Sequence, residues 1–312
     1  MARDIRDIAA SARARLLRLA KDRGEDFSGV LVRYGLERLL ARLVRSPHAD
    51  RFVLKGATLF SLWADVPHRT TRDLDLLGSG DSSVAEMVRI FREVCGVAVE
   101  PDGLVFDLDS VQGAVIREDE EYEGVRVTLL AFLAKARLPL QVDIGIGDVI
   151  FPAAAEVEVP SLLGMESPRL RAYPKETVVA EKFQAMVKLG IANSRMKDFF
   201  DVWVLANEFD FDGPTLGESV RQTFERRRTP LPAAAPLALT PEFGRDPGKQ
   251  IQWKAFLRKT GLKAPDLPDV LASLATFLVP VLDGVRRDGR LEGGWVAGGG
   301  WSAGQTEPDR AG

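Results

Sequence analysis

Apolar residues in the first part of the chain recur at two different periods. Residues 4–23 and 28–46 carry leucines and valines three and four positions apart, which is typical of amphipathic helices. Phe52-Val53-Leu54 is a short apolar run, and residues 73–77 alternate with the two-residue period of a strand. Ser82 or Ser83 is suited to cap a helix that continues through Val94.

The middle of the chain is rich in β-branched residues. This composition predicts β-structure over 104–145, with breaks at Gly124 and Pro139. The predicted strands are Val111–Ile116, Val125–Phe132 and Leu138–Ile146.

After Pro160 the apolar spacing becomes mostly helical. Gly190 is a predicted C-cap of one helix, and Ser194 a predicted N-cap of the next. The predicted helices are 174–189, 196–208, 214–227, 248–259 and 267–285. Residues 229–247 are rich in Pro and Ala and predict a loop.

These elements predict an α+β fold in which a mixed sheet with flanking helices is followed by a mostly helical half. We expect a sheet domain over 1–159, including the N-terminal helices, and a helical domain over 160–288 that completes the active site. The Gly-rich tail, 289–312, is predicted to be disordered.

Composition narrows the class of protein. The net charge of −3 excludes a strongly basic binder of nucleic acid, so an RNA partner would be held by local patches such as Arg226–Arg228, a run that is more often a solvated helix end. Two histidines make a His-rich zinc site improbable and favour carboxylate ligands. We see no signal peptide and no apolar run of the roughly 18 residues that span a membrane, and therefore predict a cytoplasmic protein without a membrane partner.

The candidate chemistry is concentrated between residues 52 and 77. A strand runs into Lys55-Gly56-Ala57-Thr58, where a helix opens and continues through Trp63, and a second strand carries Asp73 and Asp75. Residues two apart on a strand share a face, so the two carboxylates repel each other unless a cation lies between them. Two aspartates with substrate phosphates suit Mg²⁺, and two such ions can activate a hydroxyl and stabilise leaving pyrophosphate. The alternative is a solvated strand end after an ordinary turn.

The turn itself suits an anion. A glycine lets a phosphate approach the backbone closely, and a helix N-terminus offers free N–H groups to it. Gly56 has this place in the sequence and Lys55 lies beside it. We therefore predict nucleotide binding at Lys55, Gly56, Ala57 and Thr58.

Two later segments carry lysine and aspartate on predicted helices. Lys182 follows Ala180-Glu181 among apolar neighbours, where a lysine needs a carboxylate or phosphate partner. Asp198 and Asp201 are three residues apart and share a helix face. A snorkelling lysine and acids that complement the helix dipole are the simpler interpretations of each segment alone.

The order of these motifs resembles the polymerase-β-like nucleotidyltransferase superfamily, in which a Gly-Ser or Gly-Gly turn precedes a D-x-D strand. Arg69-x-Thr71-x-Asp73-Leu74-Asp75, Ala180-Glu181-Lys182 and Lys197-Asp198-Phe199-Phe200-Asp201 resemble the AbiEii branch, which includes the MenT-like toxins. The resemblance spans roughly Val53 to Trp203. Ala57 departs from it, because many relatives have Ser or Gly there, although Thr58 follows.

The resemblance implies roles for these residues. Asp73 and Asp75 would hold metal, Lys182 would bind nucleotide phosphates, and Asp198 would be catalytic or orient Lys182. Asp201 and Arg69 are less certain members of the site. A third carboxylate is common on a neighbouring strand in the superfamily; Asp143 fits that place, either as general base or as a metal ligand, and Asp148 is a weaker rival in a predicted turn.

The resemblance also implies a function. It predicts an Mg²⁺-dependent toxin that transfers NMP from an NTP to RNA, with the 3′ end of tRNA as acceptor, translation blocked as the result, and an antitoxin as protein partner. Two alternatives stay open: a nucleotidyltransferase that modifies a protein or small molecule, and a non-catalytic module that binds nucleotide or a partner. Ala57 is the feature that favours the module.

Overall fold

The computed structural model of the chain describes residues 5–63, 72–119, 122–287 and 291–302. It divides into two compact units. The first contains Met1–Gly147 and Ala155–Ala172, and the second contains Asp148–Ala154 and Tyr173–Gly312. The division therefore falls at Ala172 rather than at the predicted 159, and a short segment after residue 147 belongs to the second unit.

A seven-stranded mixed sheet forms the centre of the first unit, with the order β3-β4-β5-β2-β1-β7-β6. Parallel pairing joins β2 to β5 and β1 to β7, and the other neighbours are antiparallel. The strands are β1 Phe52–Lys55, β2 Leu74–Gly78, β3 Leu104–Asp119, β4 Tyr122–Leu133, β5 Ala136–Ile146, β6 Ala155–Glu158 and β7 Arg169–Ala172. The fold class is α+β, as predicted, although β6 and β7 were not expected.

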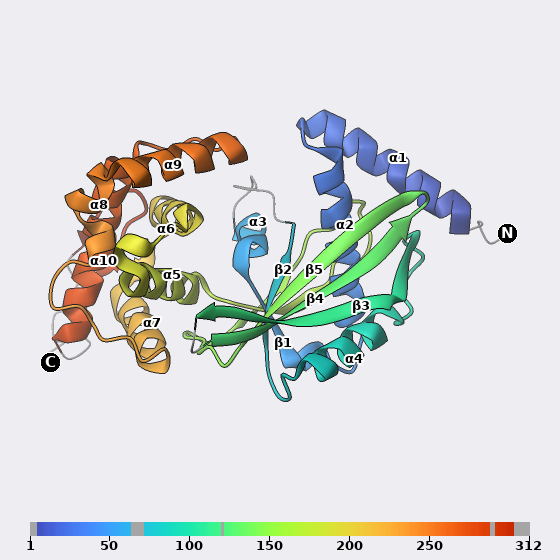
Figure 1. Cartoon of the computed structure of the whole chain (residues 1–312), viewed down its shortest axis with the longest axis horizontal. Coiled ribbons are helices and arrows are strands. Elements are labelled where there is room, and N and C mark those ends of the chain that lie inside the picture. The colour runs from blue at the N-terminus through green and yellow to red at the C-terminus, as the bar shows by residue number, and fades with distance from the viewer. Residues whose placement is uncertain (1–4, 64–71, 120–121, 288–290, 303–312) are drawn as a thin grey trace, which may run out of the picture. The chain divides into compact units, whose positions relative to one another are not determined.

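Helices cover one face of this sheet. They are α1 Ile5–Arg23, α2 Phe27–Leu43 and α4 Val84–Cys95, and Ser83 caps α4 as predicted by accepting a hydrogen bond from the N–H of Glu86. A Cβ added at Gly35 of α2 would lie 2.9 Å from the side chain of Leu140, so α2 packs closely on β5. Figure 1 shows α4 beside β3 and β4.

Alternation along the strands separates the two faces. On β5, Leu138, Leu140, Val142 and Ile144 are buried, whereas the intervening residues are exposed or half-buried. Because successive side chains of a strand point to opposite faces, Asp143 lies on the face opposite to the one that α2 covers. The helix-covered face is therefore the apolar core, and the other face is available for chemistry.

Two residues predicted to break strands lie inside them. Gly124 is part of β4, and a Cβ there would lie 2.9 Å from the carbonyl oxygen of Ile144. Pro139 lies in β5 opposite Leu130 of β4. On its other side β5 pairs with β2 only from Val142 onward, so the missing N–H of Pro139 falls where β5 is still an edge.

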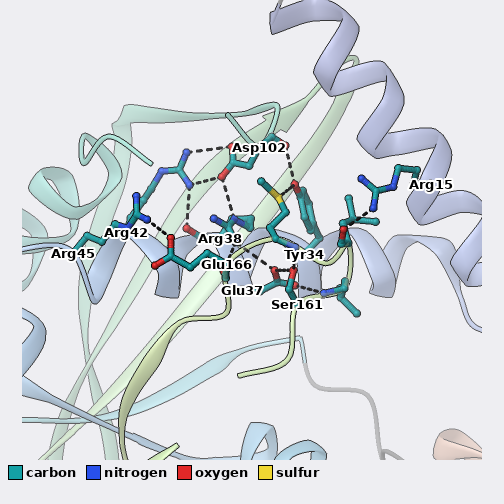
Figure 2. Close-up of polar contacts among 12 residues, drawn as sticks. Arg15, Tyr34, Glu37, Arg38, Arg42, Arg45, Asp102, Ser161 and Glu166 are labelled. Atoms are coloured by element: carbon teal, nitrogen blue, oxygen red, sulfur yellow. Dashed lines mark hydrogen bonds and ion pairs between the residues drawn. The ribbon is translucent and has the colours of Figure 1, made fainter. Parts of the chain in front are cut away.

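A buried ionic cluster, defined as Tyr34, Glu37, Arg38, Arg42 and Asp102, fixes α2 to the rest of the first unit (Figure 2). Asp102 accepts hydrogen bonds from Arg42 at 2.6 and 3.3 Å and from Nε of Arg38 at 3.3 Å. The Tyr34 hydroxyl donates to the carbonyl of Asp102 at 2.8 Å. The segment before β3 is thus bound to three positions of α2.

The same cluster binds a second segment. Glu37 accepts hydrogen bonds of 2.8 Å from the Ser161 hydroxyl and the N–H of Leu162, and Arg38 donates to the carbonyl of Glu166 at 3.1 Å. Burial raises the pKa of the Glu37 carboxyl, and these two donors and Arg38 oppose the rise. The cluster thus ties α2, the segment before β3 and residues 161–166 together.

The second unit is mostly helical. Its helices are α5 Lys175–Leu189, α6 Met196–Glu208, α7 Gly213–Arg226, α8 Pro241–Arg245, α9 Pro247–Thr260 and α10 Leu267–Arg286. Gly190, at a φ of 48°, ends α5 as predicted. The predicted cap Ser194 was wrong, because Arg195 holds the N-cap position of α6 without a side-chain hydrogen bond.

Two segments of the second unit are more ordered than their composition predicts. The expected loop over 229–247 contains α8. The expected disordered tail contains β9 Gly294–Trp295 and β10 Trp301–Ser302. These two strands form a small sheet with β8 Phe211–Asp212, in the order β10-β9-β8. An aromatic side chain explains the order of this tail, because Trp295 is buried and its indole N–H donates to the carbonyl of Ala206 at 2.6 Å. The glycine content of the tail predicts flexibility, but it takes no account of how Trp295 and Trp301 pack.

Within the described residues, α10 is the one helix long and apolar enough to cross a membrane by length and composition. Half of that stretch is buried within the protein. Trp301 donates its indole N–H to the carbonyl of Phe277 in the middle of this helix at 3.1 Å. A buried core helix meets the same criteria.

Candidate functional site

Four charged residues form a row across the uncovered face of the sheet, which we call the charge row. Strand register places Lys55 of β1 opposite Asp75 of β2, Asp75 opposite Asp143 of β5, and Asp143 opposite Arg126 of β4. Residues directly opposite each other on neighbouring strands point to the same face. The row therefore brings together two carboxylates on adjacent strands with a cation on each outer side.

The turn between β1 and the next helix is shaped around Asp75. Gly56 has a φ of +74°, which is left-handed backbone that favours glycine, and a Cβ there would lie 1.9 Å from Oδ2 of Asp75. The predicted helix opens as a 3-10 turn over Gly56–Leu59, followed by the four-residue α3 Phe60–Trp63. Glycine thus lets the Asp75 carboxylate lie directly against the turn.

The residues after Gly56 differ in exposure. Ala57, where the resemblance suggests a serine, is buried at 4% exposure. Thr58 is half-buried, and its carbonyl accepts a hydrogen bond from the Ser61 hydroxyl at 2.6 Å. Of the two, Thr58 is therefore the one with a hydroxyl and some access to solvent.

Asp143 is held by two neighbours on the same face. Arg126 donates to both carboxylate oxygens at 2.8 Å, and the amide of Gln141 donates to Oδ2 at 3.1 Å. The hydrogen bonds to Asp143 raise the pKa of Arg126, and the charges of Asp143, Asp73 and Asp75 add to the rise. All three carboxylates therefore stabilise the positive charge of Arg126.

Asp73 lies in the bend just before β2 and is half-buried, as is Asp75. Mg²⁺ is commonly bound by one or two carboxylates together with substrate phosphates and water, so these two aspartates suit it as a donor set. Among the residues that the structure describes, no three His, Cys, Asp or Glu side chains are grouped to hold a metal by themselves. The arrangement fits a metal that binds with substrate rather than a closed protein site.

The lysine and aspartates of the two helical motifs meet in the second unit. Nζ of Lys182 on α5 lies 2.5 Å from Oδ1 of Asp198 and 3.0 Å from Oδ2 of Asp201, both on α6. Burial by itself raises the pKa of Asp198, but the Lys182 ammonium outweighs it and the pKa lies below its ordinary value. The three residues predicted from separate motifs thus form one ion cluster.

Lys175, seven residues before Lys182, does not share this cluster. It pairs with Glu176 at 3.3 Å, and its ammonium lies 5.2 Å from the centre of the Phe211 ring.

A second ion cluster in this unit contains Asp148 and Arg227, for which the predicted functional roles were weaker. Arg227 donates to Oδ1 of Asp148 at 2.8 and 3.1 Å, and it also lies 3.3 Å from a carboxylate oxygen of Glu181. The side chain of Asp148 is 5% exposed and that of Arg227 is 16% exposed. Arg227 is therefore neither a solvated helix end nor an open contact for RNA, and Asp148 is a structural partner of it.

Arg69 lies outside the described residues. Arg72 is exposed and pairs with Asp26 at 3.6 Å. Sequence reasoning missed Arg126 and Gln141, although both lie in segments predicted to be strands. Gln141 shares a face with Asp143 because it is two residues earlier on the same strand. The relation of Arg126 to Asp143 depends instead on the register between β4 and β5.

Comparison with known proteins identifies a family, and the solved structures that match include two from Helicobacter pylori. Residues 38–276 match the family described as "Nucleotidyl transferase AbiEii toxin, Type IV TA system". JHP933 from Helicobacter pylori is 16% identical, with 81% of this chain and 92% of that chain covered and a TM-score of 0.46. A provisionally assigned nucleotidyltransferase from H. pylori is also 16% identical, with 82% and 96% covered and a TM-score of 0.45. No curated protein matches the chain.

Proposed function

Because this chain belongs to the AbiEii family of nucleotidyltransferase toxins of type IV toxin–antitoxin systems, we propose that it transfers NMP from an NTP to the 3′ end of tRNA and requires Mg²⁺. The acceptor would then be unfit for aminoacylation, and translation would stop. The proposal places the protein in the cytoplasm and gives it a cognate antitoxin as partner.

The observation that carries the proposal is the placement of Asp75 opposite Asp143 and beside the Gly56 turn, with Asp73 two residues before Asp75. Mg²⁺ bound by Asp73 and Asp75 would neutralise the triphosphate and stabilise the charge that develops on pyrophosphate. A fold without chemistry has no physical reason to place like charges on adjacent strands, where they repel each other. This argues against the non-catalytic module.

The remaining residues position the nucleotide. Gly56 leaves the backbone open to a phosphate, with Lys55, Ala57 and Thr58 beside it, and we assign Lys182 to the triphosphate as well. Asp198 and Asp201 orient the Lys182 ammonium through the pairs described above. Catalysis of this kind is largely positioning and charge neutralisation.

In the reaction, the 3′-hydroxyl oxygen of the acceptor forms a bond to the α-phosphorus. The bond from the α-phosphorus to the bridging oxygen breaks, and pyrophosphate leaves with that oxygen. Asp143 is the carboxylate on the strand next to Asp75 and can accept the hydroxyl proton or complete the metal site. In either role Asp143 competes with the Arg126 guanidinium, which donates to both of its oxygens.

The test is label transfer from each α-³²P-NTP in turn to total tRNA, with Mg²⁺. We expect label in tRNA from one NTP and none after Asp75→Ala. A matched control is Asp109→Ala, which removes an exposed aspartate from β3 of the same sheet and should leave transfer unchanged.

Three outcomes separate the alternatives. Label in protein or in a small molecule instead of tRNA would redirect the proposal to another acceptor. Label in tRNA that persists after Asp75→Ala would remove the metal assignment. If no acceptor is labelled by a protein that binds NTP, the non-catalytic module replaces the enzyme.

A further inference from the structure

Asp143 is engaged by an arginine, although the proposed reaction needs its oxygens. Arg126 binds both of them at 2.8 Å, so a metal or a substrate proton that used Asp143 would compete with the guanidinium for the carboxylate. The pair lies in the middle of the sheet face that carries Asp75. A cation bound by Asp143 would therefore lie next to the positive charge of Arg126, unless Arg126 moves away.

Negative charge is concentrated beside this pair. Asp75 lies opposite Asp143 on the neighbouring strand, with Lys55 on the far side of Asp75 and Arg126 on the far side of Asp143. Carboxylates on adjacent strands repel each other strongly where water is partly excluded. Arg126 reduces this repulsion in the protein alone.

The pair is also built to open. The side chain of Arg126 is 43% exposed and that of Asp143 is 19% exposed. The guanidinium is therefore already in contact with water and can turn away from Asp143 into solvent. The pair is bidentate, but its partial exposure makes it easier to open than a buried pair such as that of Arg38 and Asp102. An arginine whose purpose was to hold the fold together would be buried, as Arg38 is.

We propose that Arg126 is a built-in counter-ion of the three carboxylates, which occupies Asp143 until substrate arrives and keeps the free enzyme from binding divalent metal tightly. Asp73 and Asp75 would hold the metal together with the phosphates of the NTP, and those phosphates would attract the Arg126 guanidinium away from Asp143. This role rests on the proposed function only in that Asp73 and Asp75 bind the metal. Arg126 is thus a positioning residue that sets the order of binding.

The experiment is titration of the full chain with Mn²⁺ in the absence of nucleotide, with free Mn²⁺ followed by electron paramagnetic resonance. We expect weak binding by the wild type and binding about fivefold to tenfold tighter after Arg126→Gln, because a positive charge near the cation is lost. Arg126→Lys keeps that charge and should restore weak binding. Asp75→Ala in the Arg126→Gln background should abolish the gain.

Arg137→Gln is the matched control. Arg137 is an exposed arginine on β5, the strand that carries Asp143, and it lies six residues before it. Its loss changes the net charge equally and should leave Mn²⁺ affinity unchanged. Melting in EDTA provides a second measurement, in which Arg126→Gln should be less stable than wild type and should regain more stability from added Mn²⁺.

The outcomes are separable from those of the label-transfer test. Equal or weaker Mn²⁺ binding after Arg126→Gln, or no binding by either protein, would overturn the counter-ion role whatever the acceptor assay gives. An equal gain from Arg137→Gln would reduce the effect to net charge and overturn it as well. Tighter binding after Arg126→Gln without label in any acceptor would support the counter-ion role and reject the proposed function.

Discussion

Two aspartates in the first unit are each bound by arginine, and they differ in almost everything else. Asp102 is 3% exposed and is shared by Arg38 and Arg42, which are 1% and 7% exposed. Asp143 is bound by the single half-exposed Arg126 on an open sheet face. Asp102 also accepts the N–H of Leu104 at 3.0 Å, whereas the other neighbour of Asp143 is the side chain of Gln141.

The difference in burial suggests that Asp102 stabilises the fold, whereas Asp143 is available for chemistry. A buried charge is tolerable only when every partner stays in place, so it cannot exchange ligands. A charge at a half-exposed position can change partners because water takes part in the exchange. Bidentate pairing with arginine is therefore not by itself evidence of a structural role.

The largest effect is expected from Asp102→Asn, which leaves Arg38 and Arg42 buried without their carboxylate. Removing one partner of a buried ion pair costs about 3–5 kcal/mol, and we expect the free energy of unfolding to fall by that amount. Urea denaturation followed by circular dichroism measures it. Asp109→Asn, at an exposed position of β3, should change stability by about 0.5 kcal/mol or less. Equal losses in the two variants would contradict the role of the buried ionic cluster.

The complementary change, Asp143→Ala, should act on activity instead. We expect label transfer to fall about 100-fold, which is typical for loss of a group that handles a proton, while stability changes by about 1 kcal/mol or less. The two variants make the comparison quantitative, because Asp102→Asn should lower stability and Asp143→Ala should lower the rate of transfer. A variant that melts as early as Asp102→Asn would show that Asp143 is structural.

Gly56→Ala should have an intermediate effect on stability and a severe one on activity. The added Cβ meets the Asp75 carboxylate, and the φ of +74° is strained for alanine. Strain of this kind costs about 1–3 kcal/mol, measurable by urea denaturation. Gly164→Ala is the matched control, because Gly164 also has a positive φ, of +67°, but its Cβ would meet nothing within 4 Å. If both variants lose the same stability and keep activity, the close approach at Asp75 has no function.

Part of the candidate site can be predicted from the sequence alone. The strand carrying Asp75, the Gly56 turn and the lysine and acids of α5 and α6 could be found from spacing and from the resemblance, because each is a local pattern. Arg126 could not, since its partner is 17 residues away and the pairing depends on register across two strands.

The burial of Asp102 was equally invisible, because a Pro-Asp-Gly segment predicts an exposed turn. Its partners come from a helix about 60 residues earlier in the chain. Local patterns therefore identify candidate acids, whereas the folded chain decides which of them stay available.

The smallest effect concerns pH and the Lys182 cluster. Because the pKa of Asp198 is lowered in the folded protein, its contribution to stability is complete above its ordinary value of 3.8 and is lost as pH falls through the lower, folded value. Asp198→Asn removes this contribution, so the stability difference between wild type and variant should be constant from neutral pH to about pH 4 and shrink below it. Tryptophan fluorescence during urea denaturation at several pH values measures it, because Trp203, Trp253, Trp295 and Trp301 all lie in the second unit. A difference that stays constant or grows below pH 4 would mean that Lys182 does not hold Asp198 ionised, and it would leave Asp201 as the partner that fixes the lysine.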